Sequence, residues 1–343
     1  MTQPPTLLLQ GAPGSPYTRK MLAVLRYKHI PYRYINRAQA DAVGLQRPKV
    51  DLLPTIFFPQ PDGSFSPAVD STPLIRRIEL AWPSRAILPP DPAVAFLDAL
   101  IEDYADEWLT KAMFHYRWHY APDREKSGRI LPIHQNIPAP AAQLAAMSTA
   151  FTDRQVGRLR YVGSNELTAP VIEASYQRFL QIFERLLSQR QFLFGARPGA
   201  ADFGISGQLT QLAHFDSTPA ALTLKIAPRV FAWVDVTEDL SGLPDDAAWS
   251  PRESAGAVLH ALLGEIGLVY AKLLLANAAA IAAGHDEVAT EIDGQPWRQA
   301  PFPYHVKCLQ ELRHLHAGLG ATDRGLVDSW LAGTGVDRLF AAP

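Results

Sequence analysis

The chain has 343 residues, of which 48% are hydrophobic, enough for about two domains of roughly 150 residues that each bury a core. Its 32 basic and 34 acidic side chains give a net charge of −2, so it lacks the basic excess that binds nucleic acids and anionic membrane surfaces. The 22 glycines and 29 prolines are too few for a low-complexity, disordered chain.

The first 92 residues alternate short apolar runs with turn residues, a pattern typical of strands. One segment among them has the 3.6-residue apolar spacing of a helix, and Ser71, with Pro73 two positions later, predicts the start of another. The order indicated is strand, helix, strand, then two strands joined by a hairpin, then a helix. The strands are predicted at residues 6–10, 31–36, 55–58 and 65–69, and the helices at 15–29 and from 71 onward.

From about residue 92 the apolar period becomes 3.6, which predicts a mainly helical remainder. The first of these helices is long, with acidic side chains early and basic ones late, an order that suits the helix dipole. Near the end of the chain, Asp293 and Gly294 predict the turn of a hairpin. The later helices are predicted at residues 141–152, 171–189, 199–215, 228–240, 255–283 (two stretches), 304–319 and 324–331.

The single cysteine, Cys308, excludes an internal disulfide, a CxxC redox pair and a cysteine-based structural zinc site. The first nine residues lack the basic segment and long apolar core of a signal peptide. The longest uncharged apolar stretch, residues 273–284, falls far short of the roughly 20 residues that span a membrane. We therefore expect a cytoplasmic protein that acts without nucleic acid or membrane.

Four short motifs occur in order, each at a predicted junction of strand and helix. They are GSPYTRK at residues 14–20, the Leu53-Pro54 pair before the third strand, VDS at residues 69–71, and FLFGARPGAADF at residues 192–203. Together they resemble the glutathione S-transferase family over roughly residues 5–240. The resemblance implies an α/β thioredoxin-like N-terminal domain followed by an all-α C-terminal domain.

This resemblance divides the chain into residues 1–88, a thioredoxin-like glutathione-binding domain, and residues 89–343, a helical domain. Within the second domain, residues 89–245 match the family's helical core, and residues 246–343 form an extra helical segment with the predicted hairpin, called the extension below. The last motif departs from the family pattern, because Gly199 stands where Ser or Thr usually caps a helix, while Asp202 keeps its place three residues on. A somewhat weaker helix start is expected there.

Ser15 stands where the family places the hydroxyl or thiol that activates glutathione, the implied co-substrate. It lies at the start of a helix, whose free N–H groups and dipole favour a thiolate. Helix capping alone also explains a serine before proline, and the two roles are compatible. Tyr17 is an alternative activator, although the family's catalytic tyrosine stands earlier. Relatives that reduce disulfides carry Cys at this place, so Ser15 and Thr18 argue against such reduction.

The remaining glutathione-binding residues follow from the resemblance. The backbone of Leu53 would pair with the cysteinyl part of glutathione, beside Pro54, which is usually cis in the family. Asp70 suits the ammonium group of the γ-glutamyl end and Ser71 suits its carboxylate. A local helix cap is the alternative explanation for the last pair. The expected glutathione-binding residues are Ser15, Tyr17, Leu53, Pro54, Asp70 and Ser71.

The second half of a transferase site would come from the long helix. Met113, Tyr116, Arg117 and Tyr120 recur at i, i+3, i+4 and i+7, so that one face can line an apolar pocket with Arg117 available for an anionic group. The same spacing suits ordinary core packing. His115 and His119 have a metal-compatible spacing, but no third ligand is evident and no metal is expected.

The leading hypothesis is a glutathione S-transferase-like enzyme that stabilises the glutathione thiolate for attack on a small, partly apolar electrophile. Members of this family usually form homodimers, so the resemblance also implies a homodimer. Two alternatives remain: a non-catalytic protein-interaction module of the same fold, which the extension and Gly199 favour, and a glutathione-dependent isomerase, dehalogenase or lyase. The extension is expected either to cover the substrate pocket or to enlarge a subunit interface.

Overall fold

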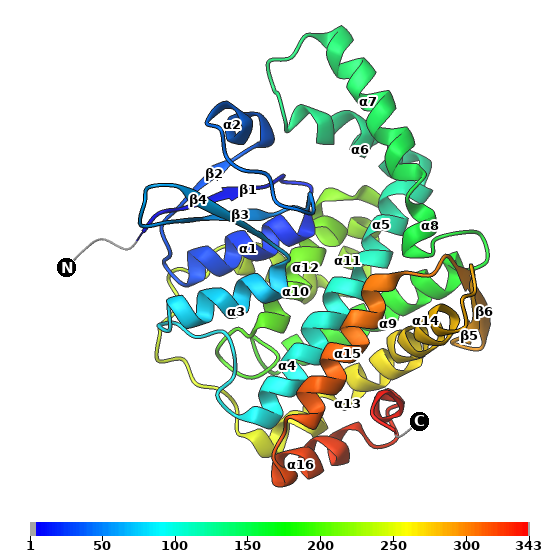
Figure 1. Ribbon diagram of the computed structural model, residues 1–343. Helices are drawn as coiled ribbons and strands as arrows, with labels where there is room; N and C mark the ends of the chain where they lie inside the picture. The colour runs from blue at the N-terminus through cyan, green and yellow to red at the C-terminus, as the bar shows by residue number, and fades with distance from the viewer. Residues whose placement is uncertain (1–4, 342–343) are drawn as a thin grey trace.

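The computed structural model describes residues 5–341 and begins with a four-stranded sheet in the order β2-β1-β3-β4 (Figure 1). β1 is parallel to β2 and antiparallel to β3, and β4 is antiparallel to β3. Alternate side chains face opposite sides: Leu7 and Leu9 join the main core with α1 and α3, whereas Leu8 packs with Phe57 beneath α2. The elements are β1 Leu7–Gln10, α1 Pro16–Tyr27, β2 Tyr32–Ile35, α2 Arg37–Ala42, β3 Thr55–Pro59, β4 Phe65–Val69 and α3 Ser71–Ala81.

The rest of the structure is helical apart from one hairpin. A long helix runs through α4, the π-helical turn η1 and α5, and the helices around it bury rows of apolar side chains, such as Phe179 and Phe183 of α9. The elements up to the extension are α4 Pro92–Tyr104, η1 Ala105–Leu109, α5 Thr110–His119, α6 Ala121–Ile133, α7 Ala141–Val156, α8 Leu159–Val162, α9 Ala169–Leu187, α10 Ala200–Leu209, the π-helical turn η2 Thr210–Phe215, α11 Ser217–Ile226 and α12 Pro228–Thr237. This confirms the expected fold class, a thioredoxin-like α/β part followed by an all-α part.

Several local features differ from the sequence prediction. The pattern does not predict α2, α6, α8 or α11, because these short helices bury few apolar side chains and so show no clear period. The prediction that Ser71 caps its helix is wrong: Ser71 is the first residue of α3, and Asp70 takes the cap position with a φ of 75° and no side-chain cap bond. Gly199 does take the cap position of α10, where a Cβ would lie 2.4 Å from the carboxylate of Asp98, and that carboxylate accepts the N–H of Ala201.

The extension packs along α4 and α9 (Figure 1). Its first part is one continuous 31-residue helix, Arg252–Ala282, rather than two stretches. By length and composition this helix would suffice to cross a membrane, but 61% of its most apolar window is buried inside the protein, as in a core helix. The elements are the 3-10 turn η3 Arg252–Ser254, α13 Ala255–Ile266, the π-helical turn η4 Gly267–Ala271, α14 Lys272–Ala282, the hairpin β5 Val288–Ile292 and β6 Gln295–Gln299, α15 Pro303–Ala317, α16 Ala321–Leu331 and the 3-10 turn η5 Val336–Leu339.

Gly207 of α10 allows α1 to approach α10 closely. A Cβ at this position would lie 2.6 Å from the carbonyl oxygen of Pro16 and 3.0 Å from the Cβ of Lys20. Because the first of these contacts is with backbone, no side-chain rotation can relieve it. The start of α1 can therefore lie this close to α10 only because residue 207 is a glycine, without a side chain.

We expect Gly207→Ala to lower the free energy of unfolding by about 1–3 kcal/mol, because α1 must move to admit the methyl group. Gly264→Ala in α13 is the matched control: its Cβ would meet no atom within 4 Å, and alanine is expected to stabilise that helix by about 0.5–1 kcal/mol. Urea denaturation measures both. A Gly207→Ala protein as stable as the wild type would contradict the close approach.

Candidate active site

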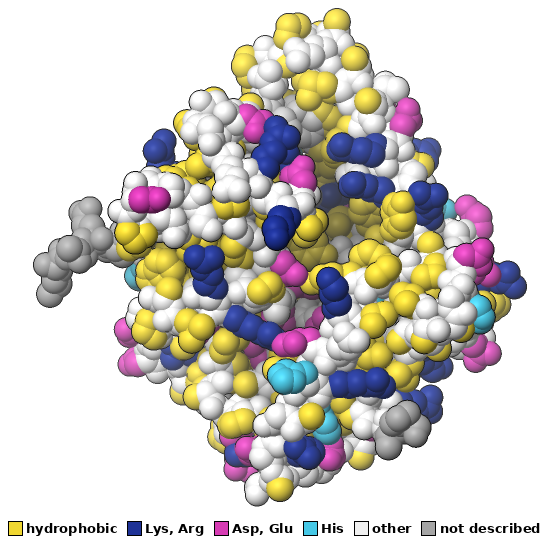
Figure 2. Space-filling model, viewed as in Figure 1, with side chains coloured by type: hydrophobic (Ala, Val, Ile, Leu, Met, Phe, Trp, Pro, Cys, Tyr) yellow, Lys and Arg dark blue, Asp and Glu magenta, His cyan; other side chains and the backbone are white. Residues whose placement is uncertain are grey.

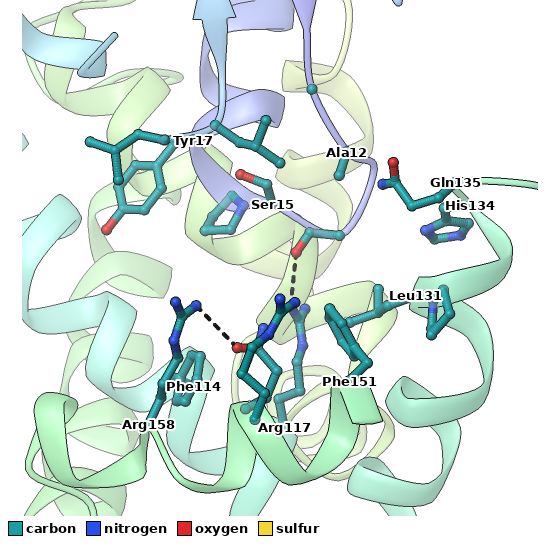
Figure 3. Close-up of a pocket in the computed structure, with 18 of the residues that line it drawn as sticks. Ala12, Ser15, Tyr17, Phe114, Arg117, Leu131, His134, Gln135, Phe151 and Arg158 are labelled. Carbon is teal, nitrogen blue, oxygen red and sulfur yellow. Dashed lines mark hydrogen bonds between the residues drawn. The ribbon is translucent and has the colours of Figure 1, made fainter. Parts of the chain in front are cut away.

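A cavity of about 900 Å³ opens between the sheet region and helices α5, α6 and α7. Figure 2 shows this face hollowed, with hydrophobic side chains in the hollow and Lys or Arg side chains at its rim. Its volume lies in the range of roughly 300–1,000 Å³ that is usual for small-molecule sites. Figure 3 shows Ala12 and Ser15 on one side of the cavity, with Phe114, Phe151 and Arg158 on the other.

Ser15 lies at the N-cap of α1 and lines the cavity. Its Oγ accepts a hydrogen bond of 3.3 Å from the backbone N–H of Thr18, and Pro16 is the first helical residue. Because Oγ acts as an acceptor in this bond, the hydroxyl hydrogen remains free to be donated to a group in the cavity. Ser15 is thus both a helix cap and part of the cavity wall.

Tyr17 and Leu53 also line the cavity, in different ways. The hydroxyl of Tyr17 donates a hydrogen bond of 2.7 Å to the backbone carbonyl of Asp106, and burial raises the pKa of this phenol well above its ordinary value. This hydroxyl is therefore occupied and unsuited to activating a thiol. Leu53 is joined by a cis peptide bond to Pro54, which is buried behind it and does not reach the cavity.

Only part of the helix face expected to bind the electrophile meets the cavity. Met113 and Arg117 line it, whereas Tyr116 and Tyr120 stack on each other, and Tyr116 packs into the core against Tyr176. Other side chains of α5 flank the stripe through Met113 and Arg117 on both sides. The π-helical turn η1 sets the rotation of α5 so that the flank away from Tyr116 faces the cavity. The lining residues that sequence reasoning missed on this helix are Thr110, Phe114 and Trp118.

The Arg117 guanidinium is fully engaged by the protein. It is 3% exposed, forms an ion pair of 2.9 Å with Asp216, and donates to the backbone carbonyl of Gly14 at 2.8 Å and to Gln211 at 2.7 Å. These bonds fix the loop that precedes Ser15. The expectation that Arg117 is available for an anionic group does not fit this geometry, because its charge is already neutralised.

Helix α7 supplies the far wall of the cavity, which the sequence did not indicate. Its cavity side is apolar at Met147 and Phe151 and basic at Arg154, and Arg158, just after the helix, adds a second basic side chain. Arg154 lies 5.2 Å above the Phe151 ring, and Arg158 donates to Gln155 at 3.3 Å. Within residues 5–341, neither arginine forms an ion pair with a carboxylate. The cavity therefore has cationic groups with spare capacity beside an apolar surface.

Asp70 and Ser71 lie near the cavity but do not line it. Ser71 is 5% exposed, and its Oγ contacts the ammonium of Lys20 at 3.2 Å and a carboxylate oxygen of Asp106 at 3.3 Å. Lys20 also pairs with Glu102 and Asp106, each at 2.6 Å. Burial opposes the charged amine, but these two carboxylates outweigh it and raise the pKa of Lys20. A charged Lys20 thus joins α1, α3 and α4.

Three carboxyl groups, one buried and two largely buried, continue along the long helix from this point. Burial raises the pKa of Asp106 to about 7 against the attraction of Lys20, and raises the pKa values of Asp103 and Glu107 to about 8. The extension supplies their neighbours: Tyr270 donates to Asp103 at 2.6 Å, and the ring of His305 lies 3.1 Å from Glu107. These carboxyl groups hold protons at neutral pH in the folded protein but not in the unfolded chain, so their protonation stabilises the folded state.

Comparison with known proteins agrees with this geometry. Residues 9–85 match the N-terminal domain of glutathione S-transferases, and residues 142–235 match the C-terminal domain of glutathione S-transferases. The chain belongs to the glutathione S-transferase family. The first matched segment contains Ser15 and nearly all of the sheet, and the second runs from α7 to α12, whereas α4 to α6 and the extension lie outside both.

Several solved structures are similar to this family member. A glutathione S-transferase from Methylobacterium radiotolerans, in complex with glutathione sulfonate, is 18% identical with a TM-score of 0.42 over 72% of this chain and 97% of its own. A maleylacetoacetate isomerase from Anaeromyxobacter dehalogenans, with bound glutathione, is 17% identical with a TM-score of 0.39 over 71% of this chain and 98% of its own. No curated protein shows significant similarity to the sequence.

His115 of this transferase-family chain is occupied by protein partners. Its ring nitrogens lie 2.8 Å from Ser164 Oγ and 3.1 Å from Glu173, and its ring stacks on His119. Among the residues that the structure describes, no three His, Cys, Asp or Glu side chains gather as a metal site would require.

The raised pKa of Glu107 predicts how stability depends on pH. The folded carboxyl holds its proton up to about pH 8, whereas the unfolded one ionises near its ordinary pKa of about 4.3, so the free energy of unfolding falls as pH rises between these values. We expect Glu107→Gln to reduce this fall by up to about 1.4 kcal/mol per pH unit. Denaturant titrations from pH 5 to 8 measure it, with the exposed Glu125→Gln as control. Parallel profiles for wild type and Glu107→Gln would contradict the assignment.

Proposed function

We propose that the protein is a glutathione transferase that stabilises the glutathione thiolate for attack on a small, partly apolar electrophile held in the cavity. The observation that carries this proposal is the position of Ser15, which caps α1 and lines a cavity of about 900 Å³ at the same time. In this proposal residues 1–88 bind glutathione and the helical part receives the electrophile.

The dimensions of the site fit a tripeptide. Ser15 and Lys20 are five residues apart at the start of α1, which corresponds to about 7.5 Å along the helix. Because Lys20 contacts Ser71, a similar length separates the Ser15 hydroxyl, proposed to bind the sulfur, from the Ser71 hydroxyl, proposed to bind the γ-glutamyl end. Three extended residues reach roughly 10 Å. Leu53 lies on the cavity wall, where it can present its backbone to the middle of the peptide.

The chemistry assigned to the chain is thiolate stabilisation. Glutathione, when bound, supplies a thiol whose pKa of about 8.5 leaves most of it protonated at neutral pH. Ser15 donates its free hydroxyl hydrogen to the sulfur, and the N-terminus of α1 adds its positive end. Arg117 fixes the preceding loop through the carbonyl of Gly14, so that the hydroxyl is held in place before the ligand arrives.

The electrophile binds against α5, α6 and α7. Phe114, Leu131 and Phe151 offer apolar contacts, and Arg154 and Arg158 take the role of anion binding that the sequence assigned to Arg117. An electrophile with an apolar body and an acidic group fits this wall. We further propose a cytoplasmic homodimer that needs no metal, nucleic acid or membrane. Light scattering at micromolar concentration tests the dimer.

We expect Ser15→Ala to lower kcat/KM by about 100-fold, because one preorganised donor to the developing charge is lost. Turnover is measured over a panel of aryl halides, epoxides and unsaturated carbonyl compounds, with the exposed Ser188→Ala as control. Calorimetry with reduced glutathione accompanies it. Near-wild-type turnover by Ser15→Ala would contradict the role of Ser15, and a wild-type protein that binds no glutathione would favour a protein-interaction module.

The double variant Arg154→Gln/Arg158→Gln is expected to raise KM about tenfold for electrophiles that carry a carboxylate, because charged hydrogen bonds to that group are lost. For the corresponding methyl esters, KM should stay unchanged. Arg129→Gln, an exposed arginine of α6 outside the cavity, serves as control. An equal change for acids and esters would show that the two arginines do not bind the acidic group.

A further inference from the structure

The start of α15 in the extension is held rigidly against the rest of the protein. The side-chain amide of Asn277, which is fully buried in α14, donates to the carbonyl of Phe302 at 3.0 Å and accepts the N–H of Phe302 at 2.8 Å. Farther along α15, Glu311 forms an ion pair of 2.6 Å with Arg76 of α3. α15 is thus tied to α14 at its start and to α3 farther along.

Two adjacent residues of the first turn of α15 reach two carboxylates from different parts of the fold. The hydroxyl of Tyr304 donates a hydrogen bond of 2.6 Å to Oδ2 of Asp70, and His305 contacts Glu107. Burial and the Asp70 carboxylate raise the pKa of Tyr304 above its ordinary value, so its hydroxyl remains a donor throughout the neutral range. The extension therefore contacts the residue expected to receive the ammonium group of glutathione.

Asp70 has little else to orient its side chain. Its backbone has a φ of 75°, and its carboxylate makes no cap bond to α3. The bond from Tyr304 engages Oδ2 and leaves Oδ1 as an acceptor. A carboxylate held in this way can bind an ammonium group through its second oxygen.

We propose that Tyr304 is a positioning residue that holds Asp70 for the α-amino group of the γ-glutamyl moiety, so that the extension completes the glutathione site within one chain. This inference rests on the proposed function. It assigns the extension a place at the γ-glutamyl end of the ligand rather than over the electrophile cavity, which within residues 5–341 has no lining residue from the extension.

The test compares Tyr304→Phe with the wild type by calorimetry, using glutathione and its analogue in which hydrogen replaces the α-amino group. We expect Tyr304→Phe to weaken glutathione binding about five- to tenfold and to leave the affinity for the analogue unchanged. At saturating glutathione, kcat should not change. Tyr161→Phe is the control, since Tyr161 is exposed and, within residues 5–341, its hydroxyl bonds only to the neighbouring Arg160.

A double-mutant cycle with Asp70→Asn separates positioning from a general structural effect. If Tyr304 acts through the Asp70 carboxylate, Tyr304→Phe has little further effect on glutathione affinity in the Asp70→Asn background. Unchanged glutathione affinity in Tyr304→Phe, or an equal loss with the analogue, would overturn the inference while the proposed function stands. A wild-type protein that binds no glutathione would overturn both.

Discussion

The buried ammonium of Lys20 is the point on which the arrangement of the two parts of the protein depends. It is 1% exposed and meets Ser71 of α3 and two carboxylates of the long helix, so three elements converge on a single charge. Withdrawing such a charge from water is costly unless its partners stay in place, and any displacement of α3 or α4 is therefore resisted. Because Lys20 lies in the same helix that Ser15 begins, this constraint fixes the proposed sulfur site relative to the γ-glutamyl site.

The π-helical turn η1 has a comparable effect on the electrophile side. It lies where Tyr17 reaches the backbone carbonyl of Asp106, and it sets the rotation of α5 relative to α4. That rotation directs Phe114 to the cavity and Tyr116 to the core. The start of α1, the ion cluster around Lys20 and the turn η1 together position the sheet side of the cavity and the face of α5 that meets it.

Much of the architecture was predictable from local pattern, but the composition of the site was only partly so. Short apolar runs bounded by turn residues define the strands, and a serine before proline marks the start of α1, because both signals act within a few residues. The wall formed by α7 was not predictable, since this helix has no fully buried residue and its cavity-facing side is decided by packing with α6. The partners of Arg117 come from segments about a hundred residues away, which no periodicity reveals.

The contact between Tyr304 and Asp70 has a consequence for the order in which the protein becomes functional. The two residues are 234 positions apart, and the ion pair between Arg76 and Glu311 spans 235. During synthesis the sheet region leaves the ribosome long before α15 exists, so a nascent chain can fold its thioredoxin-like part while Asp70 still lacks its partner. Full affinity for glutathione would then arise only at the end of translation, because a chain released before α15 is made lacks Tyr304 and leaves Asp70 unpositioned.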